Sequence, residues 1–452
     1  MGKKLPNYVS TTNACKLCKP LGASLAFRGI EGAVPFLHGS QGCATYMRRY
    51  IISHFNEPID IASSSLGEKH AVYGGSANLK LGLKNVTAKY NPKLIGVATT
   101  CLTETIGDDV KMILAEYQEE FQTGAKEPLI ISVSTPSYSG THMEGFNAAV
   151  LAVARQLAQG GAKGETVNVL PGFLSAADIR YLKELLTDFG LLATIFPDYS
   201  ATLDGEALND YPLIPEGGTP LAAIREMGRA RLTIECGATL PEETAGSYLQ
   251  EAFNVPLVQL GLPIGIRQTD LLMERLVEAA GAPIPKKYSN ARGRLIDAMV
   301  DGHKYIFGKR AIVYGEEDLV VGITGFLAEI GIQPVLCASG GKSGKLRQSI
   351  AQVLALTGSE MPEVHEDVDF YDIEERAAEL ELDLLVGHSK GYSFARRQNI
   401  PLIRVGFPIH DRVGGQRLLH VGYHGALQLF DSITNTMIAK KQDDSEVGYS
   451  YM

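Results

Sequence analysis

The sequence predicts an α/β fold built from three Rossmann-like, doubly wound domains with parallel sheets. Short β-type runs alternate with helical stretches along almost the whole chain, which is the pattern of βαβ units. In the first third of the chain, each run leads into Gly, Ser, Thr or Cys, so a turn is expected after each of those strands. At 452 residues, the chain also exceeds the size at which one hydrophobic core stops growing. Together, these observations predict several α/β domains in series.

The expected strands fall into three groups along the chain. The first group is Val34–Leu37, Leu94–Ala98 and Leu129–Val133. The second is Thr166–Leu170, Leu192–Phe196, Arg231–Glu235 and Pro256–Leu260. The third is Arg310–Tyr314, Pro334–Cys337, Leu382–Val386 and Pro401–Val405. Each group is sufficient for one small doubly wound sheet.

Two interruptions separate these groups. The glycine-rich linker Gly160–Glu165 follows a helix-like run and precedes a fresh strand. Pro283–Pro285 ends a second pattern, after which residues 292–307 read as a helix that leads into the strand at Arg310. We therefore expect domain I at residues 1–160, domain II at 161–285 and domain III at 286–452.

The composition excludes several classes of protein. Apolar residues make up 45% and charged residues 21%, which are globular values. No run approaches the roughly 18 apolar residues of a membrane span, and no apolar segment follows the first lysines as in a secretory signal, so we expect a cytoplasmic protein. A net charge of −9 without a long basic run disfavours nucleic acid as a partner. Six cysteines are too few for a disulfide framework, so metal binding or burial must explain them.

Three cysteines occupy the same kind of position within domain I. Cys43 ends the glycine-rich turn His38–Cys43 directly after a strand, and helix-like residues follow it. Cys101 also directly follows a strand and precedes a helical run expected near Gly107, and Cys18 precedes a short helical stretch. Ligands of parallel sheets bind at the carboxyl ends of strands, where helix N-termini favour anions. We therefore expect these three thiols to form one site and to have lowered pKa values.

A sulfur-rich site of this kind suits an iron–sulfur cluster or zinc. Cys15 and Cys18 form a Cys-x-x-Cys pair, which alone would suit a zinc knuckle, but the chain has no second such pair. A four-iron cluster needs four ligands, so three from this chain imply a fourth from Cys15 or a site shared with a second subunit. The residues favour a cluster over zinc, and the shared arrangement predicts a partner chain.

Other candidate residues have simpler interpretations. Cys236 and Cys337 are expected as small, buried, apolar residues at the ends of strands. Arg48, Arg49 and His54 form a cationic group near Cys43. This group either balances the charge of an anionic cluster or forms a solvated face.

Four motifs, in order, resemble one known family. They are Cys-x-Pro-Leu-Gly-Ala at 18–23, His-Gly-Ser-Gln-Gly-Cys at 38–43, His-Phe-x-Glu-Pro at 54–58, and Thr-Thr-Cys-x-x-Glu with Ile-Gly-Asp-Asp at 99–109. Together they closely resemble the β-type subunits of nitrogenase component 1 and their assembly paralogues. The resemblance continues through Gly387–Lys390 and Gly406–Pro408, so it covers essentially the full chain.

Within this family, three segments resemble the β-type subunit of the scaffold on which the iron–molybdenum cofactor is assembled. They are residues 406–417, 288–305 and 447–452, and the short N-terminus agrees with them. The resemblance implies an α2β2 heterotetramer with the scaffold's α-type subunit, which holds the cofactor precursor. It also implies an ATP-dependent iron-protein reductase that delivers electrons through a cluster at the αβ interface. On this interpretation the chain is not an enzyme on its own.

The resemblance also assigns site residues. Cys18, Cys43 and Cys101 match the cysteines that ligate the eight-iron P-cluster of catalytic β subunits, and Ser137 matches a serine that can approach that cluster. Some scaffold β subunits keep only the match to Cys43. The implied cofactor is therefore a [4Fe–4S] or a P-cluster-like [8Fe–7S] cluster shared with the α-type partner. The alternative function is the β subunit of a catalytic nitrogenase or nitrogenase-like reductase acting on dinitrogen or a methylthio-alkane.

Overall fold

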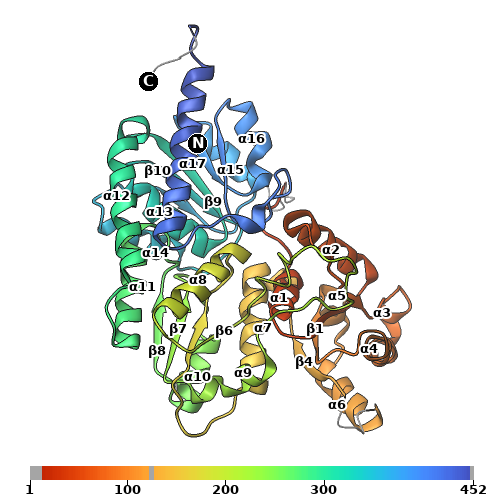
Figure 1. The fold of residues 1–452 in the computed structure, drawn as a ribbon. Coiled ribbons are helices and arrows are strands. Elements are labelled where there is room, and N and C mark those ends of the chain that lie inside the picture. Colours follow the sequence, from red (N-terminus) through yellow and green to blue (C-terminus); the bar gives the residue numbers. More distant parts are fainter. Residues whose placement is uncertain (1–12, 122–126, 448–452) are drawn as a thin grey trace.

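The protein contains three parallel β-sheets, seen in a computed structural model that describes residues 13–121 and 127–447 (Figure 1). The first sheet has the order β2-β1-β3-β4, formed by Ala62–Ser63, Ala33–His38, Leu94–Thr99 and Leu129–Val133. The second has the order β6-β5-β7-β8, formed by Ala193–Ile195, Val167–Leu170, Leu232–Cys236 and Leu257–Leu260. The third has the order β11-β10-β9-β12-β13, formed by Glu363–His365, Gln333–Ser339, Arg310–Gly315, Leu384–Gly387 and Leu402–Arg404.

This arrangement confirms the predicted fold class. Every strand expected from the sequence is present, and the structure adds the short edge strands β2 and β11. In each sheet the chain begins at an inner strand and then extends in both directions, which is the doubly wound pattern. The strand order reverses beside β1, β5 and β9, and such reversal points are where α/β proteins bind ligands.

Helices connect the strands and cover the sheets. Those associated with the first sheet are α1 (Lys19–Arg28), α2 (Gln41–Phe55), α3 (His70–Tyr73), α4 (Ser76–Tyr90), α5 (Cys101–Ile106), α6 (Val110–Phe121) and α7 (His142–Leu157), with the short 3₁₀ helix η1 (Ser137–Ser139). With the second sheet come α8 (Ala176–Asp188), α9 (Leu221–Glu226), η2 (Met227–Arg229), α10 (Ala245–Phe253) and α11 (Gly265–Ala280). The remainder are α12 (Lys286–Ile306), α13 (Glu317–Glu329), α14 (Leu346–Ala355), α15 (Phe370–Ala377), η3 (Ser389–Gly391), α16 (Tyr392–Arg397), η4 (Gly415–Arg417) and α17 (Gly422–Asp443).

The central strands are buried along their whole length. All six residues of β1 and of β3 are buried, as expected for parallel strands covered by helices on both faces. The largest hydrophobic cluster includes residues of all three sheets, such as Ala98 of β3, Val169 of β5 and Val313 of β9. The predicted boundaries after residues 160 and 285 stay predictions, because this core continues from one sheet to the next.

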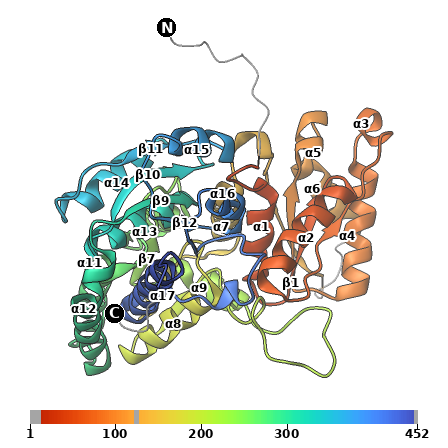
Figure 2. The ribbon, with the colours of Figure 1, turned by 90° about the horizontal axis from the view of Figure 1, so that it is seen from above.

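Helices α1 and α7 cross in close contact, because each has a glycine at the crossing point. A Cβ atom on Gly22 would lie 1.7 Å from the carbonyl oxygen of His142, and one on Gly145 would lie 1.8 Å from that of Lys19. Figure 2 shows the two helices side by side near the centre of the molecule. The crossing fixes the start of α1 against the start of α7.

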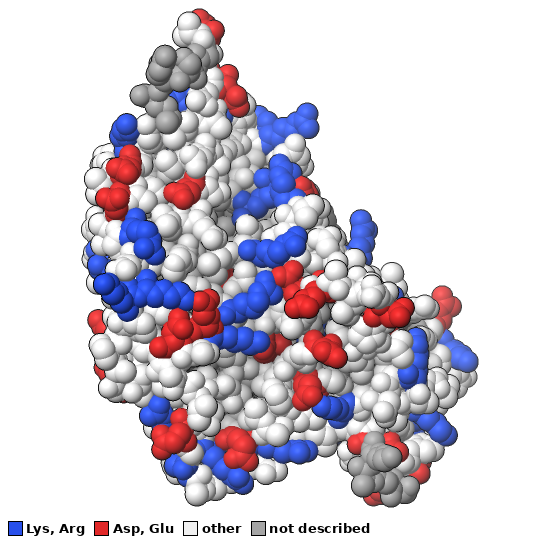
Figure 3. All heavy atoms as spheres, viewed as in Figure 1, with Lys and Arg blue, Asp and Glu red and all other residues white. Residues whose placement is uncertain are grey.

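Charge is mixed on the face shown in Figure 3, where acidic and basic side chains lie close to one another. In the described part of the chain, no helix combines the length and the apolar character needed to cross a bilayer.

Candidate functional site

Cys43 and Cys101 lie at the reversal point of the first sheet. Strands β1 and β3 pair in register from Ala33 opposite Leu94 to His38 opposite Thr99, so they end side by side. Cys43 is the third residue of α2, which follows β1, and Cys101 is the first residue of α5, which follows β3. The sheet therefore brings together two cysteines that are 58 positions apart in the sequence.

The two cysteine-bearing turns are packed against each other. A Cβ atom on Gly39 would lie 2.2 Å from Oγ1 of Thr100, so only glycine fits there without a shift. Thr100 caps α5 together with Thr103 in a capping box, and its backbone N–H donates to the His38 carbonyl at 3.1 Å. Helix α5 therefore covers Cys101–Ile106, and Gly107 caps its end with φ +77°. The sequence did not predict this short helix, whereas the helical run expected near Gly107 is present as α6, Val110–Phe121.

Cys18 reaches the same site from α1. It is the N-cap residue of α1, and it pairs through its backbone with Thr141 at the start of α7. Helix α1 begins at Lys19, earlier than the stretch expected from the sequence, with a proline in its first turn. Cys18, Cys43 and Cys101 are all partly exposed, and the sulfurs of Cys43 and Cys101 both lie within electrostatic range of Cys18. The structure thus places the three predicted cysteines on one surface.

Ser137 connects two of these cysteines. Its backbone N–H donates a hydrogen bond to Sγ of Cys101 at 3.1 Å, and its hydroxyl is hydrogen-bonded to the Cys18 thiol. The same hydroxyl accepts the backbone N–H of Lys19 at 3.2 Å. Ser137 is partly buried and lies in η1, between β4 and α7. It therefore orients Cys18 and Cys101, so it is more than a turn residue.

The pKa of Cys18 is raised, so the sequence expectation of a lowered value is wrong for this residue. Burial is the main cause, and the neighbouring sulfurs of Cys101 and Cys43 add to it, whereas the Ser137 hydrogen bond and Lys390 act in the opposite direction. Desolvation disfavours the thiolate more than the helix N-terminus favours it. A cationic metal centre bound to the sulfur would reverse this balance.

Lys390 brings a positive charge to the site from the third sheet. It lies in η3, and its ammonium group donates to the carbonyl of Ala14 at 2.8 Å and lies 5.6 Å from the centre of the Tyr50 ring. Burial lowers its pKa, and the thiols of Cys15 and Cys18 partly offset this effect. Sequence reasoning did not find Lys390, because it is 372 positions away from Cys18.

The cationic group expected near Cys43 is only partly present. Nη2 of Arg48 lies 3.4 Å from a carboxylate oxygen of Asp60 in a half-exposed ion pair. His54 is buried, and burial lowers its pKa to about 3, so it is neutral at physiological pH. Its Nδ1 accepts the backbone N–H of Ile409 at 2.9 Å. His54 is therefore a structural residue and adds no charge to the site.

Cys15 belongs to a different environment from Cys18. Its side chain is buried in the hydrophobic cluster of the third sheet, and its sulfur lies 3.8 Å from Nε2 of His388. Burial raises its pKa to about 12. Among residues 13–121 and 127–447, no three His, Cys, Asp or Glu side chains are grouped closely enough to hold one metal ion. This geometry does not support the zinc-knuckle alternative.

Cys236 and Cys337 are confirmed as buried structural residues. They are 2% and 0% exposed, and burial raises the pKa of each thiol to about 12.

His38 and Asp108 form a supporting pair that the sequence analysis did not predict. Nε2 of His38 lies 3.0 Å from Oδ2 of Asp108, which also accepts the backbone N–H of Gly75. This pair explains why the Ile-Gly-Asp-Asp motif lies next to the glycine-rich turn in space.

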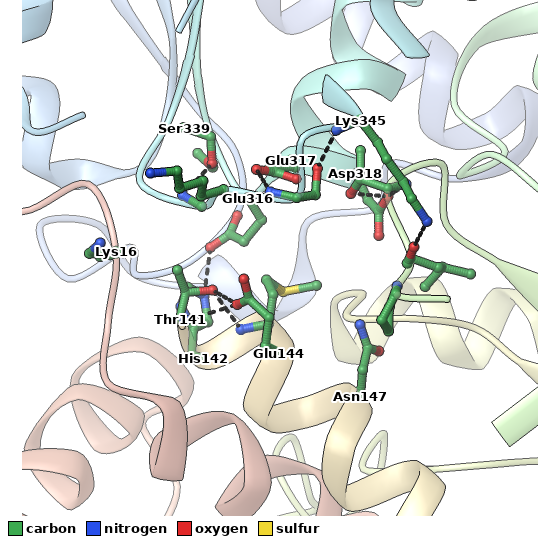
Figure 4. Close-up of a pocket in the computed structure, with 18 of the residues that line it drawn as sticks. Lys16, Thr141, His142, Glu144, Asn147, Glu316, Glu317, Asp318, Ser339 and Lys345 are labelled. Carbon is green, nitrogen blue, oxygen red and sulfur yellow. Dashed lines mark hydrogen bonds and ion pairs between the residues drawn. The ribbon is translucent and has the colours of Figure 1, made fainter. Parts of the chain in front are cut away.

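A cavity of about 340 Å³ lies near this site, where the three sheets meet (Figure 4). Its charged side chains are held by hydrogen bonds within the chain, mostly to backbone groups. Nε2 of His142 lies 3.1 Å from Oε1 of Glu316, and Glu317 accepts the backbone N–H of Ser343 at 3.1 Å. Burial raises the pKa of Glu317 to about 7. We interpret this cavity as a polar junction between the sheets, since backbone and side-chain groups of the surrounding loops satisfy its ionic groups.

The fold and the site together define a class of protein: a three-sheet α/β chain with three cysteines converging at one edge. Residues 18–438 match the family model of nitrogenase component 1 type oxidoreductases. The nitrogenase molybdenum-iron protein β chain of Clostridium pasteurianum is 37% identical over 429 residues, covering 95% of this chain and 93% of that protein. The nitrogenase iron-molybdenum cofactor biosynthesis protein NifN of Bradyrhizobium diazoefficiens is 35% identical over 445 residues, covering 97% and 92%.

The structural comparison agrees with these matches. A solved chain of nitrogenase Cp1 at pH 6.5 superposes with a TM-score of 0.95 at 35% identity, covering all of this chain and 98% of that one. The chain therefore belongs to the nitrogenase component 1 family. Within that family it is a β-type subunit, and both catalytic β chains and a cofactor-biosynthesis protein are similar to it.

Proposed function

We propose that this chain is the cluster-carrying β-type subunit of a nitrogenase-type complex, acting as part of the scaffold for cofactor assembly. The observation that carries the cluster assignment is the convergence of Cys18, Cys43 and Cys101 on one surface, with Ser137 between two of them. Three partly exposed thiols from three separate helices suit a multi-iron cluster better than a single ion.

The donor set fits an iron–sulfur cluster that is shared with another chain. The three thiols are soft ligands, and their partial exposure leaves them open to a facing subunit. Three sulfurs leave a four-iron or eight-iron cluster incompletely ligated, so an α-type partner supplies the remaining ligands. In this site, the cluster would supply one-electron transfer between an iron-protein reductase and the cofactor of the partner. The resulting complex is an α2β2 heterotetramer in the cytoplasm.

Residues of this chain would hold and tune the cluster. The backbone N–H of Ser137 donates to the Cys101 sulfur, and such hydrogen bonds stabilise negative charge on cluster thiolates. Lys390 adds a positive charge on the side of Cys18. The capping box at Thr100 and the His38–Asp108 pair fix the turns that carry Cys101 and Cys43.

The assembly role is supported by segment 406–417, which packs beneath the cysteine-bearing helix α2. Ile409 donates its backbone N–H to His54 near the end of α2. A Cβ atom on Gly415 would lie 2.9 Å from the His54 ring, so the Gly-Gly-Gln-Arg sequence fits closely against that helix. This segment is one of the three that resemble scaffold subunits, and NifN is similar over nearly its full length.

A second candidate is the β subunit of a catalytic nitrogenase or nitrogenase-like reductase. Retention of all three cysteines together with Ser137 favours it, because these positions match the ligands of an eight-iron cluster. The similarity to the β chain of Clostridium pasteurianum supports it as well. The two candidates differ in the type of cluster and in whether the complex reduces substrate.

Purification of the complex with its α-type partner tests the assembly role. We expect a [4Fe–4S] signal in electron paramagnetic resonance of the dithionite-reduced complex, a cofactor precursor that can be transferred to a cofactor-free nitrogenase, and no reduction of acetylene or dinitrogen. An oxidised P-cluster signal, together with substrate reduction supported by the iron protein, would establish the catalytic alternative instead. A complex without iron would refute both.

A further inference from the structure

Glu104 is the charged residue of helix α5 and lies about one turn after Cys101. It ends the Thr-Thr-Cys-x-x-Glu motif. Its carboxylate oxygen Oε1 accepts hydrogen bonds from the hydroxyl groups of Thr99 and Ser134, both at 2.5 Å. Thr99 is the last residue of β3, and Ser134 directly follows β4. One carboxylate therefore joins the ends of two neighbouring strands.

Side-chain bonds continue the alignment of these strands beyond their backbone pairing, which ends at Ala98 and Val133. The backbone N–H of Thr135 donates to Oγ1 of Thr99 at 2.8 Å, and the Thr135 hydroxyl donates to the Thr99 carbonyl at 2.7 Å. Both threonines are buried, so these bonds are shielded from water. The position of Thr135 is thus set by Thr99.

Glu104 determines how the Thr99 hydroxyl is used. A hydroxyl group has one hydrogen to donate and lone pairs with which to accept. A carboxylate only accepts, so it takes the Thr99 hydrogen and leaves a lone pair toward the Thr135 N–H. A hydroxyl that donates to a charged group is also polarised into a stronger acceptor. Glu104 therefore strengthens the bond that holds Thr135.

The turn after Thr135 carries this constraint to Ser137. Only Pro136 separates the two residues, and its ring restricts φ, which is −68° here. The Pro136 carbonyl accepts the backbone N–H and the hydroxyl of Ser139, at 3.1 and 2.9 Å, which closes the turn. The position of Thr135 therefore sets the direction of the Ser137 N–H, which donates to Sγ of Cys101 at 3.1 Å.

We propose that Glu104 is a positioning residue for the cluster, whose carboxylate holds Thr99 and Ser134 and thereby aims the Ser137 N–H at the Cys101 sulfur. This role rests on the proposed function, because the sulfur concerned is a cluster ligand there. Hydrogen bonds to a cluster sulfur stabilise its reduced state, so Glu104 raises the reduction potential through Ser137. The negative charge of Glu104 itself acts in the opposite direction, so the two effects are separable.

Hydrogen–deuterium exchange of the full chain, prepared without iron, tests the positioning step alone. Mass spectrometry follows a peptide spanning residues 133–140, which contains the amides of Thr135 and Ser137. We expect exchange at these amides to be at least tenfold faster in Glu104→Ala, because both hydroxyl groups lose their acceptor. Glu104→Gln keeps an acceptor oxygen and should stay within twofold of the unmodified chain. Glu119→Ala, at an exposed position of α6, is the matched control and should also stay within twofold.

A redox titration of the iron-loaded complex, followed by electron paramagnetic resonance, tests the effect on the cluster. We expect Glu104→Gln to make the midpoint more positive, because it removes a negative charge and keeps the turn. The midpoint of Glu104→Ala should be more negative than that of Glu104→Gln, because the alanine variant also loses the aimed N–H. Equal shifts in the two variants would show that Glu104 acts through its charge alone, and would overturn the proposal.

The two measurements separate the role of Glu104 from the proposed function. Unchanged exchange in Glu104→Ala overturns the role even if the complex is fully loaded with iron. A complex without iron refutes the proposed cluster, and a change in exchange would then leave Glu104 a structural role only.

Thermal melting verifies that each variant is folded. If Glu104→Ala does not fold, Ser134→Ala removes one of the two hydroxyl groups at an exposed position and keeps the charge of Glu104. It should give faster exchange and a more negative midpoint than the unmodified protein. No change in either quantity would overturn the proposal.

Discussion

Among single residues, Lys390 has the clearest expected effect on the cluster. Its positive charge lies within electrostatic range of Cys18 and stabilises added negative charge there. We expect Lys390→Met to retain iron but to make the reduction potential more negative by roughly tens of millivolts. Lys390→Arg should keep the potential near its original value. A redox titration followed by electron paramagnetic resonance measures this, and an unchanged midpoint in the methionine variant would exclude the role.

His54 makes the stability of the protein dependent on pH. Burial lowers its pKa to about 3 in the folded chain, against 6.5 in the unfolded chain. Between these values the unfolded state binds the additional proton, so the free energy of unfolding decreases as the pH falls, by about 1.4 kcal/mol per pH unit. This contribution is fully present above pH 6.5.

Urea unfolding at pH 7 and pH 5 measures this contribution in the unmodified chain and in His54→Gln, which offers Ile409 an acceptor that does not titrate. From pH 7 to pH 5 we expect the unmodified chain to lose about 2 kcal/mol more than the variant. Equal losses would show that His54 already carries a proton in the folded protein.

At the scale of elements, the crossing of α1 and α7 positions Cys18. Gly22→Ala would place a methyl group within 1.7 Å of a backbone oxygen of α7, so the helices must separate. We expect a loss of about 1–3 kcal/mol in stability and a decrease in bound iron, because Cys18 moves with the start of α1. Gly293→Ala in α12 is the control, since nothing lies within 4 Å of its Cβ position. If Gly22→Ala loses stability but keeps its full iron content, the helix crossing does not position Cys18 for iron binding.

The sequence predicted strands better than the starts of helices. Of the two missed strands, β2 has only two residues, Ala62 and Ser63, and pairs with one edge of β1, so it has no apolar run to reveal it. Helix α1 starts at Lys19 although Pro20 and Gly22 favour a later start, because proline is tolerated in a first turn and the glycine is required by α7. Local patterns identify an element, and tertiary contacts then set its limits.

The sequence could predict those residues of the candidate site that have a characteristic side chain and lie at the end of a regular strand. Cys43 and Cys101 each directly follow a buried strand, and parallel strands must end at the same edge of the sheet. Lys390 was not predictable, because its role depends on neighbours far along the chain.

On the scale of the whole molecule, the three sheets share one hydrophobic core. We therefore expect the chain to remain assembled after it is cut in the exposed linker 160–165. A site-specific protease sequence placed there, followed by size-exclusion chromatography under native conditions, tests this. The fragments should elute together and separate on a denaturing gel. Separate elution of a folded N-terminal fragment would show that residues 1–160 form an independent domain.

The most direct measurement is the iron content of the purified complex in four single cysteine variants. Cys18→Ala, Cys43→Ala and Cys101→Ala each remove a thiol from the partly exposed group, whereas Cys236→Ala removes a buried thiol from β7. We expect each of the first three to lose iron and to weaken or alter the cluster signal in electron paramagnetic resonance. Cys236→Ala should retain both. Full iron content and an unaltered signal in all of the first three would contradict the assignment of a cluster to this site.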